Sequence, residues 1–203
     1  MLSVKDVYNK IAPHFDVSRQ RVWGSVKQFL SSLPKNSHVL DLGCGNGKNM
    51  LYRKDLNMVG IDISSELVKI CQNKQLYVYE ASITELPFQT NTFDNMLCIA
   101  TYHHLDNEAH REKALKEFYR CLKSGGKLLI TVWSITQPEG SPFKFTKADE
   151  LVPWTTPDGT TYLRYYHIYD NNELENEIYK LCPSFKIVQK GWELGNIYII
   201  LEK

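Results

Sequence analysis

The feature that most constrains the fold is a glycine-rich segment, Asp41-Leu-Gly-Cys-Gly-Asn-Gly47, which follows a short apolar run at His38–Leu42. Alternate glycines in such a turn let the backbone approach a ligand where any Cβ atom would clash. From this point on, short β-branched runs alternate with helical patterns. The alternation predicts an α/β fold in which a mostly parallel sheet carries helices on both faces.

Hydrophobic periodicity places the individual elements. Helices are expected at 3–12 and 19–33, separated by Pro13, and then at 64–74, 107–123 and 171–181. Ser64 is the expected N-cap of the third helix, and Ser124-Gly125-Gly126 is the expected C-cap of the fourth. Strands are expected at 38–42, 58–62, 76–79, 93–100, 127–133, 185–190 and 197–201. The link between the last two is too short for a crossover helix, so these strands must be antiparallel.

The charge of the chain is unevenly distributed. The net charge is only +1, from 24 Lys and Arg against 23 Asp and Glu. A simple electrostatic nucleic-acid binder would instead have a pI above about 9. Residues 1–54 nevertheless carry +6 and the remainder carries −5. This basic N-terminal quarter is a candidate phosphate-facing surface, with a solvated helix face as the alternative.

The cysteines and the apolar runs indicate the cellular setting. The five cysteines show no C-x-x-C pairing and no zinc-ligand spacing, so no metal site is expected. Their apolar surroundings indicate reduced thiols in an intracellular protein. There is no signal-peptide pattern, and no apolar run approaches the roughly 18 residues that span a bilayer. The expected location is therefore cytoplasmic, with no membrane partner.

An acidic residue completes the first motif. Asp62 ends the second expected strand, 21 residues after Asp41, where a carboxylate can accept hydrogen bonds from both hydroxyls of a ribose. The Asp-x-Gly-x-Gly-x-Gly spacing and the antiparallel terminal hairpin together resemble the class I S-adenosylmethionine (SAM) methyltransferases. The resemblance implies a Rossmann-like, seven-stranded sheet and SAM as cofactor. It assigns cofactor binding to Asp41, Gly43, Gly45, Gly47, Asp62, Ile63, Ser82, Ile83 and Ile99.

Ser82 departs from the pattern of this superfamily, which has an acidic residue here to hold the adenine amino group. A serine hydroxyl can accept a hydrogen bond, but it brings no charge. The departure leaves open a second interpretation, namely a catalytically silent binding protein with the SAM fold.

Further segments resemble the eukaryotic tRNA wobble-uridine carboxymethyl methyltransferases over nearly the whole chain. They are Tyr8–Phe15, Ser18-Arg19, Trp23, Ile99–His104, Val132–Ser134, Leu151–Trp154 and Arg164–His167. The resemblance implies esterification of the carboxylate of 5-carboxymethyluridine in the tRNA anticodon loop. It also implies a small zinc-binding activator subunit. The uncharged edge strand expected at Leu76–Tyr79 is the candidate seam for that subunit.

The expected reaction needs no general base, because a carboxylate is already ionised at neutral pH. It needs a cation to hold that carboxylate, and Arg19 and Arg164 are candidates because guanidinium binds carboxylate bidentately. Trp133, Trp154 and Tyr165 are candidates for stacking on extruded anticodon bases, and His103 and His167 complete the candidate site. The structural alternatives are a bridge between helices and sheet for Arg19, core packing for Trp133, and hydrogen bonding or loop ordering for the two histidines.

The chain is expected to form one methyltransferase domain over residues 1–203. Its parts are N-terminal helices at 1–36, a SAM-binding core at 37–134, a substrate loop at 135–169, and a C-terminal helix and hairpin at 170–203. Within the loop, residues 135–163 form a long connection with four of the eight prolines. A methyltransferase for a small molecule remains an alternative, although it gives no reason for the basic N-terminal quarter.

Overall fold

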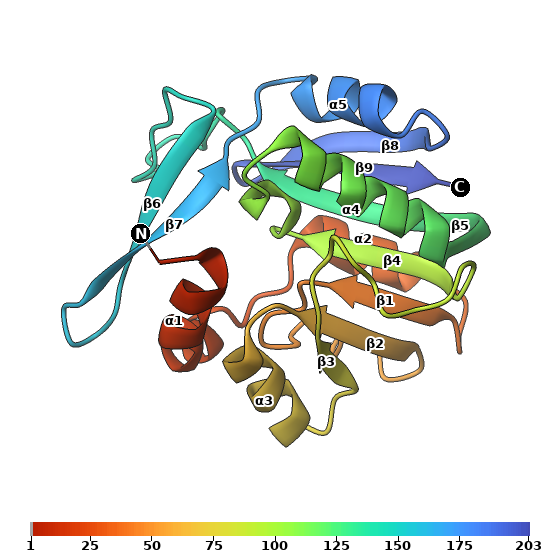
Figure 1. The fold of residues 1–203 in the computed structure, drawn as a ribbon, viewed down its shortest axis with the longest axis horizontal. Helices are drawn as coiled ribbons and strands as arrows, with labels where there is room; N and C mark the ends of the chain where they lie inside the picture. Colours follow the sequence, from red (N-terminus) through yellow and green to blue (C-terminus); the bar gives the residue numbers. More distant parts are fainter. Residues whose placement is uncertain (1) are drawn as a thin grey trace.

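A seven-stranded sheet in the order β3-β2-β1-β4-β5-β9-β8 forms the centre of the protein (Figure 1). The computed structural model describes residues 2–203. The sheet strands are β1 (His38–Leu42), β2 (Asn57–Asp62), β3 (Val78–Glu80), β4 (Phe93–Ile99), β5 (Leu122–Trp133), β8 (Lys186–Glu193) and β9 (Asn196–Glu202). The helices are α1 (Val4–Ser18), α2 (Gly24–Ser32), α3 (Ser65–Asn73), α4 (Glu108–Cys121), α5 (Glu173–Leu181) and a 3-10 turn η1 (Tyr102–His104). No helix within residues 2–203 is long and apolar enough to cross a membrane.

The strand directions agree with the sequence analysis. Strands β1 to β5 are parallel, with β1 paired to β2 and β4, β3 to β2, and β5 to β4. Strand β9 lies antiparallel between β5 and β8. The turn before it is Leu194-Gly195, and both residues have the positive φ angles of a tight hairpin turn. The mostly parallel seven-stranded sheet with a C-terminal antiparallel hairpin is therefore confirmed.

Helices cover both faces of the sheet, as expected for parallel strands that are buried on both sides. On one face, Phe118 of α4 and Ile178 of α5 pack into a cluster with Met96 of β4. On the other face, Phe29 of α2 and Val68 of α3 belong to a second cluster. Ser64 caps α3 as predicted, because its hydroxyl accepts a hydrogen bond from the backbone N–H of Leu67.

Helix α1 is continuous through Pro13, so the prediction that this proline separates two helices is wrong. A proline inside a helix removes one backbone hydrogen bond. Ile11 and Phe15, on either side of it, pack with Trp154 in one apolar cluster, and this packing maintains the helix.

Helix α2 begins at Gly24, and not near residue 19 as predicted. The carboxylate of Glu193, at the end of β8, accepts hydrogen bonds from the backbone N–H groups of Gly24 (2.7 Å) and Ser25 (2.9 Å). A carboxylate at this position satisfies otherwise unpaired donors and complements the helix dipole. The start of α2 is thus fixed by Glu193, a residue far along the chain. Arg19 therefore lies in the non-helical segment between α1 and α2.

The edge strand β3 starts two residues later than predicted. Gln75 has a positive φ of 61°, and the Leu76 N–H bonds back to the carbonyl of Cys71, so Leu76 still belongs to the turn that ends α3. The strand includes Glu80, which forms an ion pair with Lys5 at 2.6 Å. The edge therefore carries one acidic residue, contrary to the expectation of an uncharged strand.

The boundary between α4 and β5 also differs from the prediction. Helix α4 ends at Cys121, and Ser124-Gly125-Gly126 lies within β5 and not in a helix C-cap. The reason is pairing with the chain end, because the Gly125 N–H bonds to the Lys203 carbonyl and the Lys203 N–H bonds to the Gly126 carbonyl.

The long connection after β5 contains an antiparallel hairpin that the sequence analysis did not place. Its strands are β6 (Asp149–Thr155) and β7 (Thr161–His167), which form a separate two-stranded sheet. The hairpin lies beside α1 (Figure 1), and Trp154 joins the two by packing on Val7 and Ile11. This contact brings a chain segment after residue 150 next to the N-terminus.

The core on the α4 face is expected to dominate stability. Replacing the fully buried Phe118 by Ala should lower the free energy of unfolding by about 3–5 kcal/mol, because it removes apolar contacts and leaves a cavity. Urea unfolding followed by circular dichroism measures the change. Lys116→Ala on the exposed side of the same helix is the control and should change the value by less than about 0.5 kcal/mol. An equal loss in both variants would contradict this picture of the core.

Candidate active site

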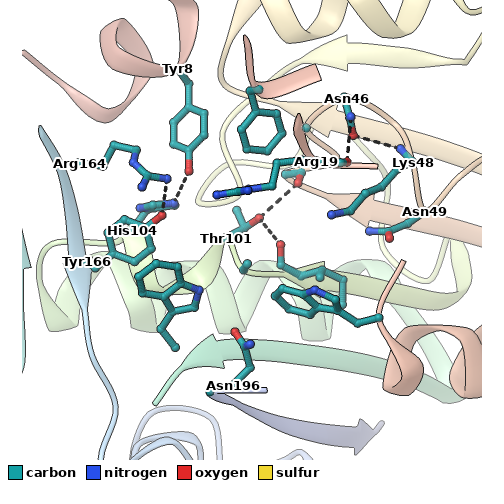
Figure 2. Close-up of a pocket in the computed structure, with 18 of the residues that line it drawn as sticks. Tyr8, Arg19, Asn46, Lys48, Asn49, Thr101, His104, Arg164, Tyr166 and Asn196 are labelled. Carbon is teal, nitrogen blue, oxygen red and sulfur yellow. Dashed lines mark hydrogen bonds between the residues drawn. The ribbon is translucent and has the colours of Figure 1, made fainter. Parts of the chain in front are cut away.

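A cavity of about 710 Å³ opens at the carboxyl ends of the parallel strands. Ligands bind at this edge in open α/β sheets. Its wall is formed by the glycine loop after β1, the ends of β2, β4 and β5, the end of α1, strand β7 and the segment 137–143. Figure 2 shows side chains from α1, the glycine loop and β7 facing one another across the cavity.

The glycine loop is closely packed against its surroundings. Gly43 has a φ of 73°, and a Cβ there would lie 2.3 Å from the side chain of Thr101. Gly43 and Gly45 line the cavity, as expected for a cofactor loop. Gly47 does not line it, because this residue packs under Leu76, whose side chain would lie 2.3 Å from an added Cβ. Gly47 therefore allows the loop to pack on the end of α3.

Asp62 lies at the end of β2 and lines the cavity. Its carboxylate accepts hydrogen bonds from the backbone N–H groups of Gly45 (2.8 Å) and Ser64 (2.9 Å), which fix its orientation. Burial raises the pKa of Asp62 to about 6 despite these bonds. Each carboxylate oxygen has lone pairs left, so the group can also accept from ribose hydroxyls.

Two further polar groups near the glycine loop have no partner among residues 2–203. Both carboxylate oxygens of Asp41 and the amide oxygen of Asn49 are buried without a hydrogen bond. Burial, with the charge of Asp62, raises the pKa of Asp41 to about 7. Asn49 lines the cavity whereas Asp41 lies behind its wall. An unsatisfied buried acceptor is costly, so the Asn49 oxygen, with Asp41 behind it, fits a ligand with a cationic donor such as an ammonium group.

The other predicted cofactor residues form an apolar end of the cavity. Ile63, Ser82, Ile83 and Ile99 all line it. The Ser82 hydroxyl contacts the Thr84 hydroxyl at 2.8 Å. Asp62 and Glu139 are the acidic residues in the cavity wall of the described chain, so no carboxylate replaces the acid that Ser82 lacks. The glycine cradle, the ribose acceptor, the orphaned oxygens and this apolar end together fit SAM.

Arg19 and Arg164 line the cavity, and Arg164 lies across it from Lys48 and Asn49 (Figure 2). No carboxylate of residues 2–203 forms an ion pair with either of them. Both guanidinium groups lie against the indole of Trp154, at 4.7 and 4.8 Å from the ring centroid. Arg164 also donates to the Tyr166 hydroxyl at 2.6 Å, while its buried Nε has no partner in the described chain. The repulsion from Arg164, added to burial, lowers the pKa of Arg19.

The glycine loop itself positions Arg19. The side-chain amide of Asn46 donates to the backbone carbonyls of Asp16 (3.2 Å) and Arg19 (3.1 Å) at the end of α1. Lys74 strengthens this junction by donating to the Asp16 carboxylate at 2.6 Å and to the Asn46 carbonyl at 3.0 Å. The cofactor loop and the candidate substrate arginine are therefore connected by direct hydrogen bonds.

The paired histidines have different environments. His104 lines the cavity, donates from Nδ1 to the Tyr165 carbonyl (2.8 Å), and accepts from the Tyr8 hydroxyl at Nε2 (2.9 Å). Burial lowers the pKa of His104 to about 4, so this ring is neutral and both nitrogens are engaged. His103 is fully buried, and its Nδ1 accepts from the Trp133 N–H at 3.0 Å. The structure places His103 behind the cavity wall.

Of the remaining predicted site residues, Trp133 faces the cavity and His167 does not. Trp133 lines the cavity and stacks on Tyr166 with 4.5 Å between ring centroids. His167 lies outside the cavity and bonds Asp149 (2.9 Å) and Glu173 (2.8 Å), so it joins the base of the hairpin to α5. Tyr166 is a lining residue that the sequence analysis did not single out. Side-chain alternation along β7 could have found it, because Tyr166 shares a face with Arg164 and His167 does not.

Comparisons with known proteins identify the class of this fold. A family model described as a methyltransferase domain matches residues 40–130. The SAM-dependent methyltransferase structure from Clostridium acetobutylicum has a TM-score of 0.73 at 16% identity, covering 97% of this chain and 98% of that chain. A methyltransferase from Haloferax volcanii, solved in complex with the activator Trm112, has a TM-score of 0.71 at 16% identity, with 98% and 97% covered. The predicted Rossmann-like SAM methyltransferase fold is confirmed.

Sequence relatives identify the family of methyltransferases to which the chain belongs. The tRNA (carboxymethyluridine(34)-5-O)-methyltransferase of Schizosaccharomyces pombe is 34% identical over 98% of this chain and 96% of its own length. The relative named alkbh8 from Xenopus tropicalis is 33% identical over 98% of this chain, which spans 40% of that longer protein. The chain belongs to the family of the tRNA (carboxymethyluridine(34)-5-O)-methyltransferases.

The buried Asp41 gives a testable pH dependence. Its pKa of about 7 in the folded state lies above its ordinary value of 3.8, so the folded protein binds a proton that the unfolded chain releases between these values. The contribution of this carboxyl to the free energy of unfolding therefore falls as pH rises from about 4 to 7, with a slope approaching about 1.4 kcal/mol per pH unit. Above the pKa of about 7 the contribution no longer changes.

Asp41→Asn should remove that slope. The difference in free energy of unfolding, variant minus wild type, should increase from pH 4 to pH 7 and level off above it. Urea titrations of the ligand-free protein at several pH values measure this difference. Asp158→Asn, at an exposed turn, should show no such increase. A flat difference for Asp41→Asn would mean that the Asp41 carboxyl is ionised throughout.

Proposed function

We propose that the protein transfers the methyl group of SAM to the carboxylate of 5-carboxymethyluridine at the wobble position of tRNA. One observation carries the proposal: Arg19 and Arg164 line the cavity, and neither forms an ion pair within residues 2–203. Arg164 is buried and Arg19 is exposed, and both guanidinium groups lie against the Trp154 ring, so two positive charges without an anion meet at this wall. An anion that contacts both would offset their repulsion. A cavity of this kind selects an acceptor that is itself negatively charged, such as a carboxylate.

The cofactor end of the cavity would hold SAM through groups that are otherwise unpartnered. When bound, SAM supplies a methyl group that its sulfonium already activates. Asp62 would accept hydrogen bonds from the ribose hydroxyls, and Asn49, with the charge of Asp41 behind it, would face the ammonium group. Lys48, whose ammonium lies 5.8 Å from the ring centroid of Trp23, would hold the cofactor carboxylate. That assignment leaves the two arginines free for the acceptor.

The chain needs only to align and desolvate the acceptor. The acceptor carboxylate is ionised at neutral pH, so no residue has to remove a proton from it. His104 is unsuited to act as a base, because its low pKa keeps it neutral and Nε2 already accepts from Tyr8. Arg19 and Arg164 would fix one carboxylate oxygen toward the methyl donor, and Tyr166 and Trp133 would exclude water.

We also propose that residues 135–169 contact the tRNA, with the basic N-terminal quarter. Arg21 and Lys48 line the cavity on the side of that quarter, and the segment 137–143 lines the other side. Phosphate contacts there would position the anticodon loop, while Trp133 would stack on a base turned out of it. The cytoplasm is the proposed compartment, since the cysteines of the described chain are free and buried.

The arginine pair can be tested directly. Arg19→Met and Arg164→Met should each lower methyl transfer to tRNA at least about a hundredfold, because an unpaired acceptor carboxylate would be left in the cavity. Mass spectrometry of anticodon nucleosides after incubation with SAM measures the methyl ester. Calorimetric SAM affinity should change less than about threefold, since the cofactor uses other groups.

Lys186→Met is the control for the lost charge, because this exposed residue of β8 lies outside the cavity. It should leave both the ester yield and the SAM affinity unchanged. Full activity of Arg19→Met would contradict the assigned role. Methyl transfer to a small-molecule extract but not to tRNA would support the small-molecule alternative.

A small zinc-binding activator subunit is proposed to pair with the edge strand β3. β3 is a terminal strand of the sheet; Tyr77, just before it, is 75% exposed and Tyr79, within it, is 52% exposed. An open sheet edge with exposed aromatic side chains is suited to strand addition by a partner. The complex of the Haloferax volcanii neighbour with an activator supports the proposal.

Tyr79→Asp should weaken this assembly, because it places a negative charge at the proposed interface on β3. Co-expression with a candidate activator, followed by size-exclusion chromatography with light scattering, measures the fraction of complex. Tyr179→Asp on α5 is the matched control, since Tyr179 is 51% exposed and lies away from β3. A monodisperse, stable and fully active chain without any partner would remove the reason for an activator.

A further inference from the structure

We propose that Trp154 is a positioning residue that holds Arg19 and Arg164 at the acceptor site through cation–π attraction, while leaving N–H groups of both arginines free for the acceptor carboxylate. The inference rests on the proposed carboxylate acceptor. It assigns to Trp154 a role other than base stacking, because this indole is 6% exposed and does not line the cavity.

Trp154 contacts both arginines, which come from two separate elements. Arg19 follows α1, whereas Arg164 lies on β7, so the two arginines are far apart in the sequence. Trp154, on β6, packs on α1 and touches both guanidinium groups, at 4.7 and 4.8 Å from its ring centroid. Its Nε1 donates to His14 Nδ1 at 3.1 Å, which fixes the orientation of the ring.

An aromatic ring can hold two like-charged arginines together without occupying their hydrogen-bond donors, whereas a carboxylate would occupy them. The two guanidinium groups carry like charges on one ring, and like charges repel each other. A carboxylate would hold them together, but it would occupy the same N–H donors that the acceptor needs. The negative face of an indole attracts both cations without accepting their hydrogen bonds. The Nε–H of Arg164 has no partner in the described chain, consistent with this arrangement.

Fluorinated tryptophans at position 154 separate this role from packing. Fluorine withdraws electron density from the ring face and weakens its attraction for cations, with little change in ring size. The KM for carboxymethyl-containing tRNA should rise steadily with the number of fluorines, reaching roughly tenfold for the tetrafluorinated ring. The calorimetric Kd for SAM should stay within about twofold, because Trp154 does not line the cofactor end.

The same series at Trp192 is the matched control. This tryptophan of β8 is 45% exposed and donates to the Thr136 carbonyl, and it touches neither arginine. Its fluorination should leave KM unchanged. Trp154→Phe should retain more tRNA affinity than Trp154→Met, because phenylalanine keeps a ring face and methionine keeps only apolar volume.

The outcomes distinguish this proposal from the proposed function. An active wild type whose KM is independent of fluorination at 154, or Phe and Met variants that are equally impaired, would overturn the cation–π role and leave packing. A parallel loss of SAM affinity across the series would also overturn it. A wild type that esterifies no carboxymethyluridine, with or without an activator, would instead refute the proposed function.

Discussion

Two arginines that face one cavity without a carboxylate partner impose the main constraint on this structure. Like charges in a partly buried wall repel each other, so their positions must be fixed by the surrounding fold. Arg19 is fixed by Asn46, which holds the carbonyls at the end of α1. Arg164 is fixed by the β6–β7 hairpin, whose base His167 joins to α5. The N-terminal helix and the hairpin are therefore parts of the proposed acceptor site.

The same contacts link the two halves of the cavity. Asn46 lies in the glycine loop, so the backbone that would cradle the cofactor also holds the segment that contains Arg19. Phe15 of α1 contributes to this junction, because a Cβ at Gly45 would lie 3.1 Å from its ring. A shift of the glycine loop would accordingly move Arg19. Cofactor and acceptor sites that share a rigid junction favour the fixed alignment that methyl transfer requires.

Residue spacing and periodicity predicted those parts of the structure that depend on interactions between residues near one another in the sequence. The glycine loop, the acid at Asp62 and the order of strands and helices follow from spacing and periodicity, and the Ser64 cap needs only its own turn. Long-range contacts decided the rest. Glu193 sets the start of α2, Lys203 draws Gly125 and Gly126 into β5, and packing against Trp154 carries α1 through Pro13. None of these partners can be inferred from the residues nearby.

For the site residues, the informative property is which cations lack an ion-pair partner, and not the net charge of the segment that contains them. The +6 of the first 54 residues includes Arg19, Arg21 and Lys48, which line the cavity, but the sum does not distinguish them from the basic residues of that segment that lie elsewhere. Outside the cavity, cations such as Lys74, Arg111 and Arg120 have acidic partners within 2.7 Å. The cations that line the cavity have none in the described chain. The proposed anion site therefore combines two properties, unpaired positive charge and a position in the cavity wall, and only the three-dimensional arrangement shows them together.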